Sequence, residues 1–115
     1  MKHILAPILF LVLLFPSLAQ GEEVSHDDLV WRDGLFYKKF TDVPFTGQVM
    51  GKKEQGSFKK GKREGPWVRY HDSGRIRDKG DFKNGTSDGP WVRYKRDGTV
   101  DEEITGTYKD GAKVD

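Results

Sequence analysis

Side chains able to do acid–base or nucleophilic chemistry are few in this chain. The only histidines after the apolar N-terminus are His26 and His71, and cysteine is absent. Asp72 follows His71, but neighbouring residues on a strand point to opposite faces of a sheet, so the two form no catalytic dyad. We expect His71 to be a solvated turn residue, and a small hydrolase built on it is the weakest of three functional hypotheses.

The other polar clusters have simpler structural explanations. Asp101, Glu102 and Glu103 are consecutive carboxylates, and a surface acidic patch explains them better than a cation site. Residues 84–86 match a glycosylation sequon, but an Asn-Gly hairpin turn accounts for the same residues. The sequence contains no nucleophile elbow, phosphate loop or metal-ligand spacing. We therefore expect a protein that is not an enzyme and has no catalytic residue, cofactor or metal site.

Residues 1–19 have the features of an export signal. Lys2 precedes an apolar run over 4–15, and Ser17 and Ala19 occupy the −3 and −1 positions of a cleavage site. The run is shorter than the roughly 20 residues that a transmembrane helix needs, although an uncleaved anchor is the alternative. We predict a helical signal peptide cleaved after Ala19 and an exported protein, periplasmic or secreted. The remaining 19 basic and 18 acidic residues nearly cancel, so we expect no nucleic-acid partner.

A repeat fills the C-terminal half of the chain. The hexapeptide Gly-Pro-Trp-Val-Arg-Tyr occurs at 65–70 and again at 89–94. Gly56, Gly80 and Gly106 are in phase, at spacings of 24 and 26 residues. The repeats are therefore 56–79, 80–105 and a partial unit at 106–115.

Turn and strand signals within each unit predict antiparallel hairpins. Turn dipeptides end at regularly spaced glycines, and several are Asn-Gly or Asp-Gly, which accept the positive φ of two-residue hairpin turns. Those turns are 84–85, 97–98 and 110–111. The intervening segments are rich in Trp, Val, Tyr, Phe and Ile and show no helical period. We expect Pro66 and Pro90 each to open a strand. The predicted fold class is all-β, an elongated antiparallel β-meander.

The residues between the signal and the repeats predict one more hairpin and a leader. Residues 20–28 are polar, and we expect them to be flexible. Asp33-Gly34 lies between the apolar triplets 29–31 and 35–37, which predicts a hairpin. The stretch 40–50 should lead into the first repeat and cap the first edge of the sheet. The predicted hairpin and leader together span 29–55, and the repeats span 56–115.

The repeat pattern Gly-x-Phe/Tyr-Lys-x-Gly-x-x-x-Gly-Pro-Trp-x-x-Tyr-x-x-x-Gly resembles the MORN-like repeat. The resemblance is to its bacterial variant, found in proteins labelled YwqK-type antitoxins, and it covers about residues 29–111. The leader segments 35–38 and 43–47 are similar to that family too. The resemblance implies hairpin units stacked into an elongated antiparallel sheet that serves as an interaction scaffold. It implies no reaction.

The repeated Trp-Val-Arg-Tyr segment is the best candidate for a binding surface. Period-two alternation places the Trp and Arg side chains on one face and Val and Tyr on the other. A mainly structural role for the aromatic ladders, joined by Phe58, Phe82 and Tyr108, is the stronger interpretation, because cross-strand aromatic pairs stabilise a sheet. Partner binding would use the Trp–Arg face and the adjacent Lys-rich turn. The candidate partner-binding residues are Trp67, Arg69, Trp91, Arg93, Lys59, Lys60, Lys62 and Arg63.

These features predict an exported, non-enzymatic β-repeat module that acts as a protein-interaction scaffold in the periplasm or cell envelope. The alternative is a module that binds glycan or anionic lipid through the Trp/Arg face and the Lys-rich turn. The partner is then a protein, a cell-wall glycan or an anionic membrane surface. The sequence leaves the oligomeric state open.

Overall fold

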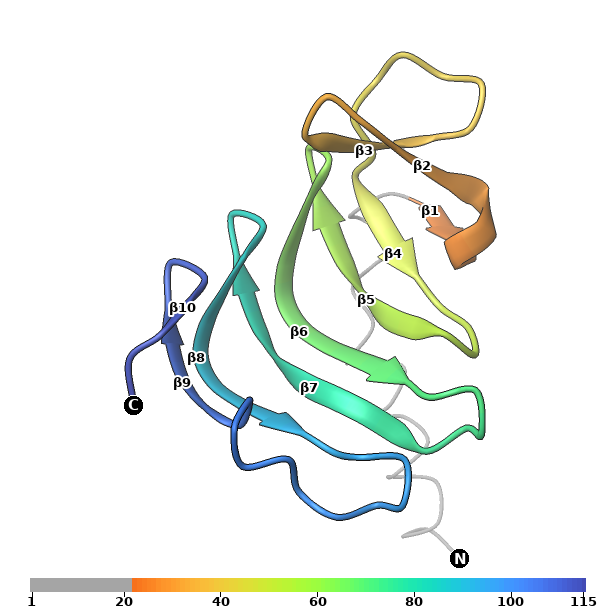
Figure 1. Cartoon of the computed structure of the whole chain (residues 1–115). Coiled ribbons are helices and arrows are strands. Elements are labelled where there is room, and N and C mark those ends of the chain that lie inside the picture. The colour runs from red at the N-terminus through yellow and green to blue at the C-terminus, as the bar shows by residue number, and fades with distance from the viewer. Residues whose placement is uncertain (1–21) are drawn as a thin grey trace, which may run out of the picture.

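The computed structural model describes residues 22–115, which form strands and tight turns (Figure 1). The predicted signal peptide and its cleavage site lie outside the described residues. Within the described part, no helix is long and apolar enough to cross a membrane. The strands are β1 (Glu22–Val24), β2 (Leu29–Arg32), β3 (Leu35–Lys38), β4 (Gly47–Val49), β5 (Glu54–Lys59), β6 (Lys62–Tyr70), β7 (Ile76–Lys83), β8 (Thr86–Arg93), β9 (Gly106–Lys109) and β10 (Ala112–Lys113), and η2 (His26–Asp28) is a short 3-10 turn.

The strands form one large sheet and one separate hairpin. The large sheet has eight strands in the order β1-β4-β5-β6-β7-β8-β9-β10, and β2 pairs with β3 alone. From β4 to β10 each strand is antiparallel to its predecessor, as in the predicted meander. The all-β, mostly antiparallel fold class is therefore confirmed. Figure 1 shows the strands side by side across a curved sheet, with the β2–β3 hairpin over one end.

Most of the hairpins use the two-residue turns that the sequence predicts. Both central residues have positive φ at Asp33-Gly34, Lys60-Gly61, Asn84-Gly85 and Asp110-Gly111, as a type I′ turn requires. Asp97-Gly98 differs, because positive φ is confined to the glycine. The Lys95 amide donates to the Thr99 carbonyl (2.8 Å) and the Gly98 amide to the Lys95 carbonyl (2.9 Å). These bonds close a three-residue loop, in which only the glycine is left-handed.

The prolines lie inside strands rather than opening them. Strand β6 begins at Lys62, and Pro66 follows Gly65, whose φ is 81°. Gly56 pairs with Trp67, whereas the next residue of β5 pairs with Glu64, so residues 65–66 bulge out of the ladder with β5. A bulge tolerates a proline because its missing amide breaks no ladder bond, and it also bends the strand. The same arrangement recurs around Pro90 in β8.

A row of interleaved aromatic rings forms the core. Ring centroids lie 5.2 Å apart for Phe58 and Trp67, 5.9 Å for Trp67 and Phe82, and 5.0 Å for Phe82 and Trp91, all edge to face. Phe36 and Trp31 extend this row beyond Phe58. We call the row the aromatic spine: Trp31, Phe36, Phe58, Trp67, Phe82 and Trp91. Edge-to-face packing of this kind stabilises a sheet that has few aliphatic residues.

The phased glycines leave the space that the indole rings occupy. A Cβ placed on Gly56 would lie 2.3 Å from the Trp67 ring, and one on Gly80 would lie 2.3 Å from the Trp91 ring. Each indole N–H then donates to the carbonyl of the residue after the glycine, over 3.0 Å from Trp67 and 2.9 Å from Trp91. Each full repeat of the sequence therefore supplies one glycine and one indole ring that stacks on it.

Residues 22–28, expected to be flexible, are instead part of the fold. Strand β1 pairs in parallel with β4, and Val24 is buried in the core. The Nδ1 atom of His26 contacts the carboxylate of Glu54, which is itself buried. The buried Val24 side chain and the contact between His26 and Glu54 hold residues 22–28 on the sheet. The first edge is thus covered by β1, with the leader strand β4 next to it.

Candidate functional site at the hairpin tips

The indoles of the repeated motif are in the interior, not on a binding surface. Trp67 is 1% exposed and Trp91 is 6% exposed. The expected alternation is found, because the Arg69 guanidinium lies on the same face as the indoles, 5.8 Å from the Trp91 ring centroid. Trp67 and Trp91 both pack on Phe82 on that face. That face is the covered face of the curved sheet, so the assignment of both indoles to a partner-binding surface is corrected.

Arg69 and Arg93 serve a buried ion cluster. Arg69 makes a two-point contact with Asp78, from Nε to Oδ1 (2.9 Å) and from Nη2 to Oδ2 (3.1 Å). Arg93 approaches the same carboxylate at 3.7 Å. Asp78 is 3% exposed, and a buried carboxylate is stable only when cations and hydrogen bonds compensate its charge. The charges of both arginines are therefore largely satisfied within the molecule.

Arg63 also turns inward, away from the neighbouring lysines. Its guanidinium carbon lies 4.8 Å from the Trp67 ring centroid and 4.9 Å from that of Phe36. Glu54 contacts it at 3.4 Å. Burial lowers the pKa of Arg63 from its ordinary value, and the Glu54 carboxylate opposes that shift. Arg63 thus belongs to the aromatic spine as a cation–π partner.

The predicted lysines do gather, and a fourth joins them. Lys59, Lys60 and Lys62 at the β5–β6 tip line a hollow of about 420 Å³ together with Lys83 from β7. We call these four residues the lysine basin. All four are exposed, and within residues 22–115 no ion pair involves any of them. Glu64 also lines this hollow and offsets one of the four positive charges. The remaining excess of clustered ammonium groups creates a positive potential that attracts anions.

Backbone contacts fix the two tips that carry the lysine basin. The Lys60 amide donates to Thr46 Oγ1 (2.9 Å), and the Asn84 amide donates to Glu64 Oε1 (2.9 Å). Lys83 was missed from the sequence, although it and Lys59 both stand three residues after a phased glycine. Strands β5 and β7 are two ladder steps apart, about 10 Å, so this repeat position places the two lysines as near neighbours.

A smaller hollow adjoins the lysine basin and carries an exposed indole. It has a volume of about 170 Å³ and shares Lys62 and Asn84 with the basin. Trp31 is 61% exposed there and is braced by Phe36, with ring centroids 4.9 Å apart. We call it the Trp31 hollow; its lining residues are Trp31, Gly34, Phe36, Gly61, Lys62, Arg63, Asn84 and Gly85. Alternation within β2 predicts the face on which Trp31 lies but not whether that face is covered. The sequence therefore does not identify Trp31 as an exposed residue of the candidate site.

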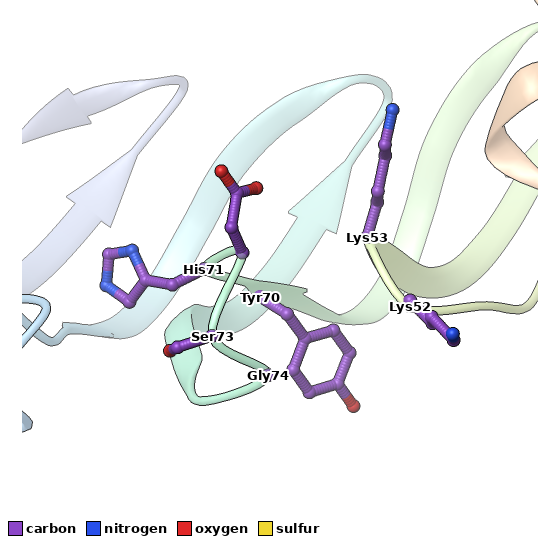
Figure 2. Close-up of a pocket in the computed structure, with 7 residues that line it drawn as sticks. Lys52, Lys53, Tyr70, His71, Ser73 and Gly74 are labelled. Carbon is purple, nitrogen blue, oxygen red and sulfur yellow. The ribbon is translucent and has the colours of Figure 1, made fainter.

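His71 lines a third hollow, on the β6–β7 loop (Figure 2). This hollow is open, about 540 Å³ in volume, and includes Lys52, Lys53 and Tyr70. Figure 2 shows the imidazole directed away from Tyr70 and the two lysines. Its Nε2 hydrogen-bonds the Tyr94 carbonyl at 2.9 Å, and within the described chain no carboxylate hydrogen-bonds the ring. Asp72 and Ser73 also line this hollow, and the imidazole is held by the Tyr94 carbonyl.

Among residues 22–115, no group of three or more His, Asp and Glu side chains is placed to hold a metal ion. Comparisons with protein families, with curated proteins and with solved structures find no match for this chain. The resemblance to MORN-like repeats therefore depends on the repeated residues themselves.

Proposed function

We propose that this protein is an exported, non-enzymatic module of MORN-like β-repeats that acts as a protein-interaction scaffold in the periplasm or cell envelope. The lysine basin carries the proposal, because four exposed ammonium groups at adjacent hairpin tips have no ion-pair partner within the described residues. Such a surface fits an acidic segment of a partner protein, which long-range attraction would bring in quickly.

The export signal and the repeat pattern support the rest of the proposal. A signal peptide cleaved after Ala19 would deliver the sheet outside the cytoplasm. The hydrolase hypothesis depends on His71, whose ring bonds a backbone carbonyl. An extended sheet with rigid, two-residue tips is well suited to holding side chains at fixed spacing for a partner.

Binding of a labelled oligo-glutamate peptide, followed by fluorescence anisotropy, tests the lysine basin. The variant Lys59→Gln/Lys60→Gln/Lys83→Gln should bind at least about tenfold more weakly, because it loses three uncompensated charges. Lys79→Gln/Lys95→Gln/Arg96→Gln is the matched control, since it removes three exposed cations elsewhere. Salt should weaken the parent's binding. Equal affinity of the two variants would contradict the proposal.

An anionic lipid surface is the second candidate, and exposed apolar residues favour it. Phe40 is 102% exposed and Val43 is 72% exposed in the loop that joins β3 to β4. Figure 1 shows this loop projecting from the end of the molecule where the β5–β6 tip lies. Apolar side chains beside lysines are typical of surfaces that bind anionic lipid. Glycan binding through stacked indoles has less support, because the Trp67 and Trp91 rings are buried.

Co-sedimentation with lipid vesicles tests the second candidate. The protein should sediment with vesicles that contain phosphatidylglycerol and not with vesicles of phosphatidylcholine alone. Phe40→Ser/Val43→Ser should reduce the bound fraction severalfold, whereas Val100→Ser/Val114→Ser, which alters two other exposed valines, should not. Equal sedimentation of the two variants would exclude the β3–β4 loop from membrane binding.

A further inference from the structure

The connection between β8 and β9 carries acidic and apolar side chains on its surface. Residues 100–104, which we call the acidic loop, read Val-Asp-Glu-Glu-Ile. The apolar residues at its two ends are exposed, Val100 by 38% and Ile104 by 42%. Within residues 22–115, no ion pair involves its carboxylates. The acidic loop is therefore a second surface without a charge partner, opposite in sign to the lysine basin.

The acidic loop is a departure from the repeat. Glu54 and Asp78 each stand two residues before a phased glycine, and both are buried among cationic side chains. The same position before Gly106 is Ile104, which is exposed. The spacing there is 26 residues rather than 24. The carboxylates of Glu102 and Glu103 thus lie on the surface before Gly106, whereas those of Glu54 and Asp78 are buried before the two earlier phased glycines.

The backbone of the acidic loop is held while two of its carboxylates stay available. The Lys113 Nζ atom donates to the backbone carbonyls of Glu102 (3.4 Å) and Glu103 (2.9 Å). Asp101 Oδ1 accepts the Glu103 amide at 3.1 Å, which braces the turn. The side chains of Glu102 and Glu103 are exposed. The structure therefore presents two exposed carboxylates on a held backbone, flanked by apolar residues.

Within residues 22–115, no ion pair joins the acidic loop to the lysine basin. The β7–β8 tip, beside Lys83, begins strand β8, and the acidic loop follows the far end of that strand. A fully extended strand of eight residues is about 26 Å long, but the bulge at Pro90 bends β8. Ile104, at the end of the acidic loop, lines a hollow together with Ser87 of β8. Figure 1 shows the β7–β8 tip and the β8–β9 connection at opposite ends of β8. A second molecule can satisfy the charge complementarity that this fold leaves unmet between the two surfaces.

We infer that the acidic loop of one copy docks on the lysine basin of a second copy. Glu102 and Glu103 pair with the ammonium groups of the basin, and Ile104 enters the adjoining Trp31 hollow. At about 170 Å³ the hollow is below the roughly 300–1,000 Å³ of drug-sized pockets, and it suits one aliphatic side chain. The inference rests on the proposed function and names a partner for the same basin. Because the two surfaces differ, the contact repeats head to tail and builds rings or open chains larger than a dimer.

Paired charge reversals test this contact. One variant reverses the basin, Lys59→Glu/Lys60→Glu/Lys83→Glu, and the other reverses the loop, Glu102→Lys/Glu103→Lys. Sedimentation velocity at low ionic strength should show the parent growing beyond a dimer with concentration and dissociating in salt. Each variant alone should be monomeric, because its two surfaces then repel. An equal mixture should associate again and grow beyond a dimer. The acidic loop of the first variant then faces the lysine basin of the second, and the lysine-bearing loop of the second faces the reversed basin of the first.

Two further measurements keep the test sharp. Circular dichroism and thermal melting should show that both variants remain folded, as expected for exposed residues. Because Trp67 and Trp91 are buried, iodide quenching reports mainly on Trp31, and the one-to-one mixture should protect it. Ile104→Ser should weaken association and the protection of Trp31, whereas Val114→Ser should change neither.

The outcomes separate this inference from the proposed function. A parent that stays monomeric at low ionic strength, or a mixture that forms no complex, overturns the self-contact. If oligo-glutamate still binds the lysine basin in that case, the scaffold function stands with another acidic partner. If the mixture forms its complex and Trp31 is protected, the second copy is the partner that the basin selects.

Discussion

Gly80→Ala adds one methyl group at the point where the repeat is most closely packed. The three atoms nearest to the added Cβ would all belong to the Trp91 ring, at 2.3, 2.4 and 2.6 Å. Ordinary contacts of a Cβ begin at about 3.4 Å, so the ring must move by roughly an ångström. Two contacts oppose that movement, the indole hydrogen bond to the Asp81 carbonyl and the edge-to-face packing on Phe82.

The expected loss of stability combines two opposing effects. Overpacking of this kind costs about 1–3 kcal/mol. Replacing glycine with alanine also restricts the unfolded chain, which returns about 0.4–1 kcal/mol. Gly80 does not have a left-handed φ, so no backbone strain is added. We expect the free energy of unfolding to fall by about 1–2 kcal/mol, which for a domain of this size lowers Tm by about 5–15 °C.

Urea unfolding followed by tryptophan fluorescence measures this change. The same substitution in a Trp91→Leu background is the control, because the atoms that the new methyl group meets are then gone. In that background the substitution should be neutral or slightly stabilising, and the difference between backgrounds is the coupling energy. An unchanged or higher stability of Gly80→Ala alone would refute the stacking explanation. So would a loss of equal size in both backgrounds.

Three further predictions concern the ion cluster, a turn and a carboxylate. Asp78→Asn should lower the free energy of unfolding, measured in urea, by about 2–3 kcal/mol. Breaking a fully buried ion pair costs roughly 3–5 kcal/mol, and the loss is smaller here because Arg69 and Arg93 keep some solvent contact. An unchanged stability would show that the two arginines do not need the Asp78 carboxylate. Lys60→Asn should raise the free energy of unfolding by about 1 kcal/mol, because Lys60 has a φ of 50° in a type I′ turn, where asparagine is preferred. A lower free energy of unfolding in urea would contradict this explanation. Hydrogen bonds from the Thr99 hydroxyl and, to a smaller extent, from the Thr99 amide lower the pKa of Asp97. These bonds therefore stabilise the fold at pH values above the ordinary pKa of the carboxyl group, and the stabilisation is lost as the pH falls through the lowered pKa. In an NMR titration Thr99→Val should raise the pKa of Asp97 toward its ordinary value, and an unmoved titration would show that the hydroxyl is not the cause.

The sequence predicted which residues share a face but not which face is covered. The phased glycines, the Asn-Gly and Asp-Gly turns, and the packing of Phe58 and Phe82 with the indoles are all found in the structure. Alternation carries no information about curvature. The curvature arises at the bulges around Pro66 and Pro90, which the sequence predicts as strand starts. The bent sheet covers its Trp–Arg face, so the expected binding ladder is interior.

The candidate site was only partly visible in the sequence for a related reason. Lys59, Lys60 and Lys62 are neighbours along the chain, and composition alone identified them. Lys83 joins them through strand pairing across β6, which only the repeat register reveals. The pairing of β1 with β4 is also a long-range contact, made by a three-residue strand too short to leave a periodic signal. Local patterns predict turns and strands well, and they say little about such contacts.

The glycine–indole contact also explains why the repeats depend on one another. Trp67 pairs with Gly56 on β5 and with Gly80 on β7, so its ring lies in a site built by two successive units. Trp91 is placed in the same way between Gly80 and Gly106. At Gly106 the space over the glycine is taken by the Lys113 side chain and the Asp115 carbonyl instead of an indole. Each ring stacks on the glycine of its own unit and also packs against the next unit, as Trp67 does on Phe82. A single hairpin therefore leaves its tryptophan partly uncovered, and stability must rise with each unit added.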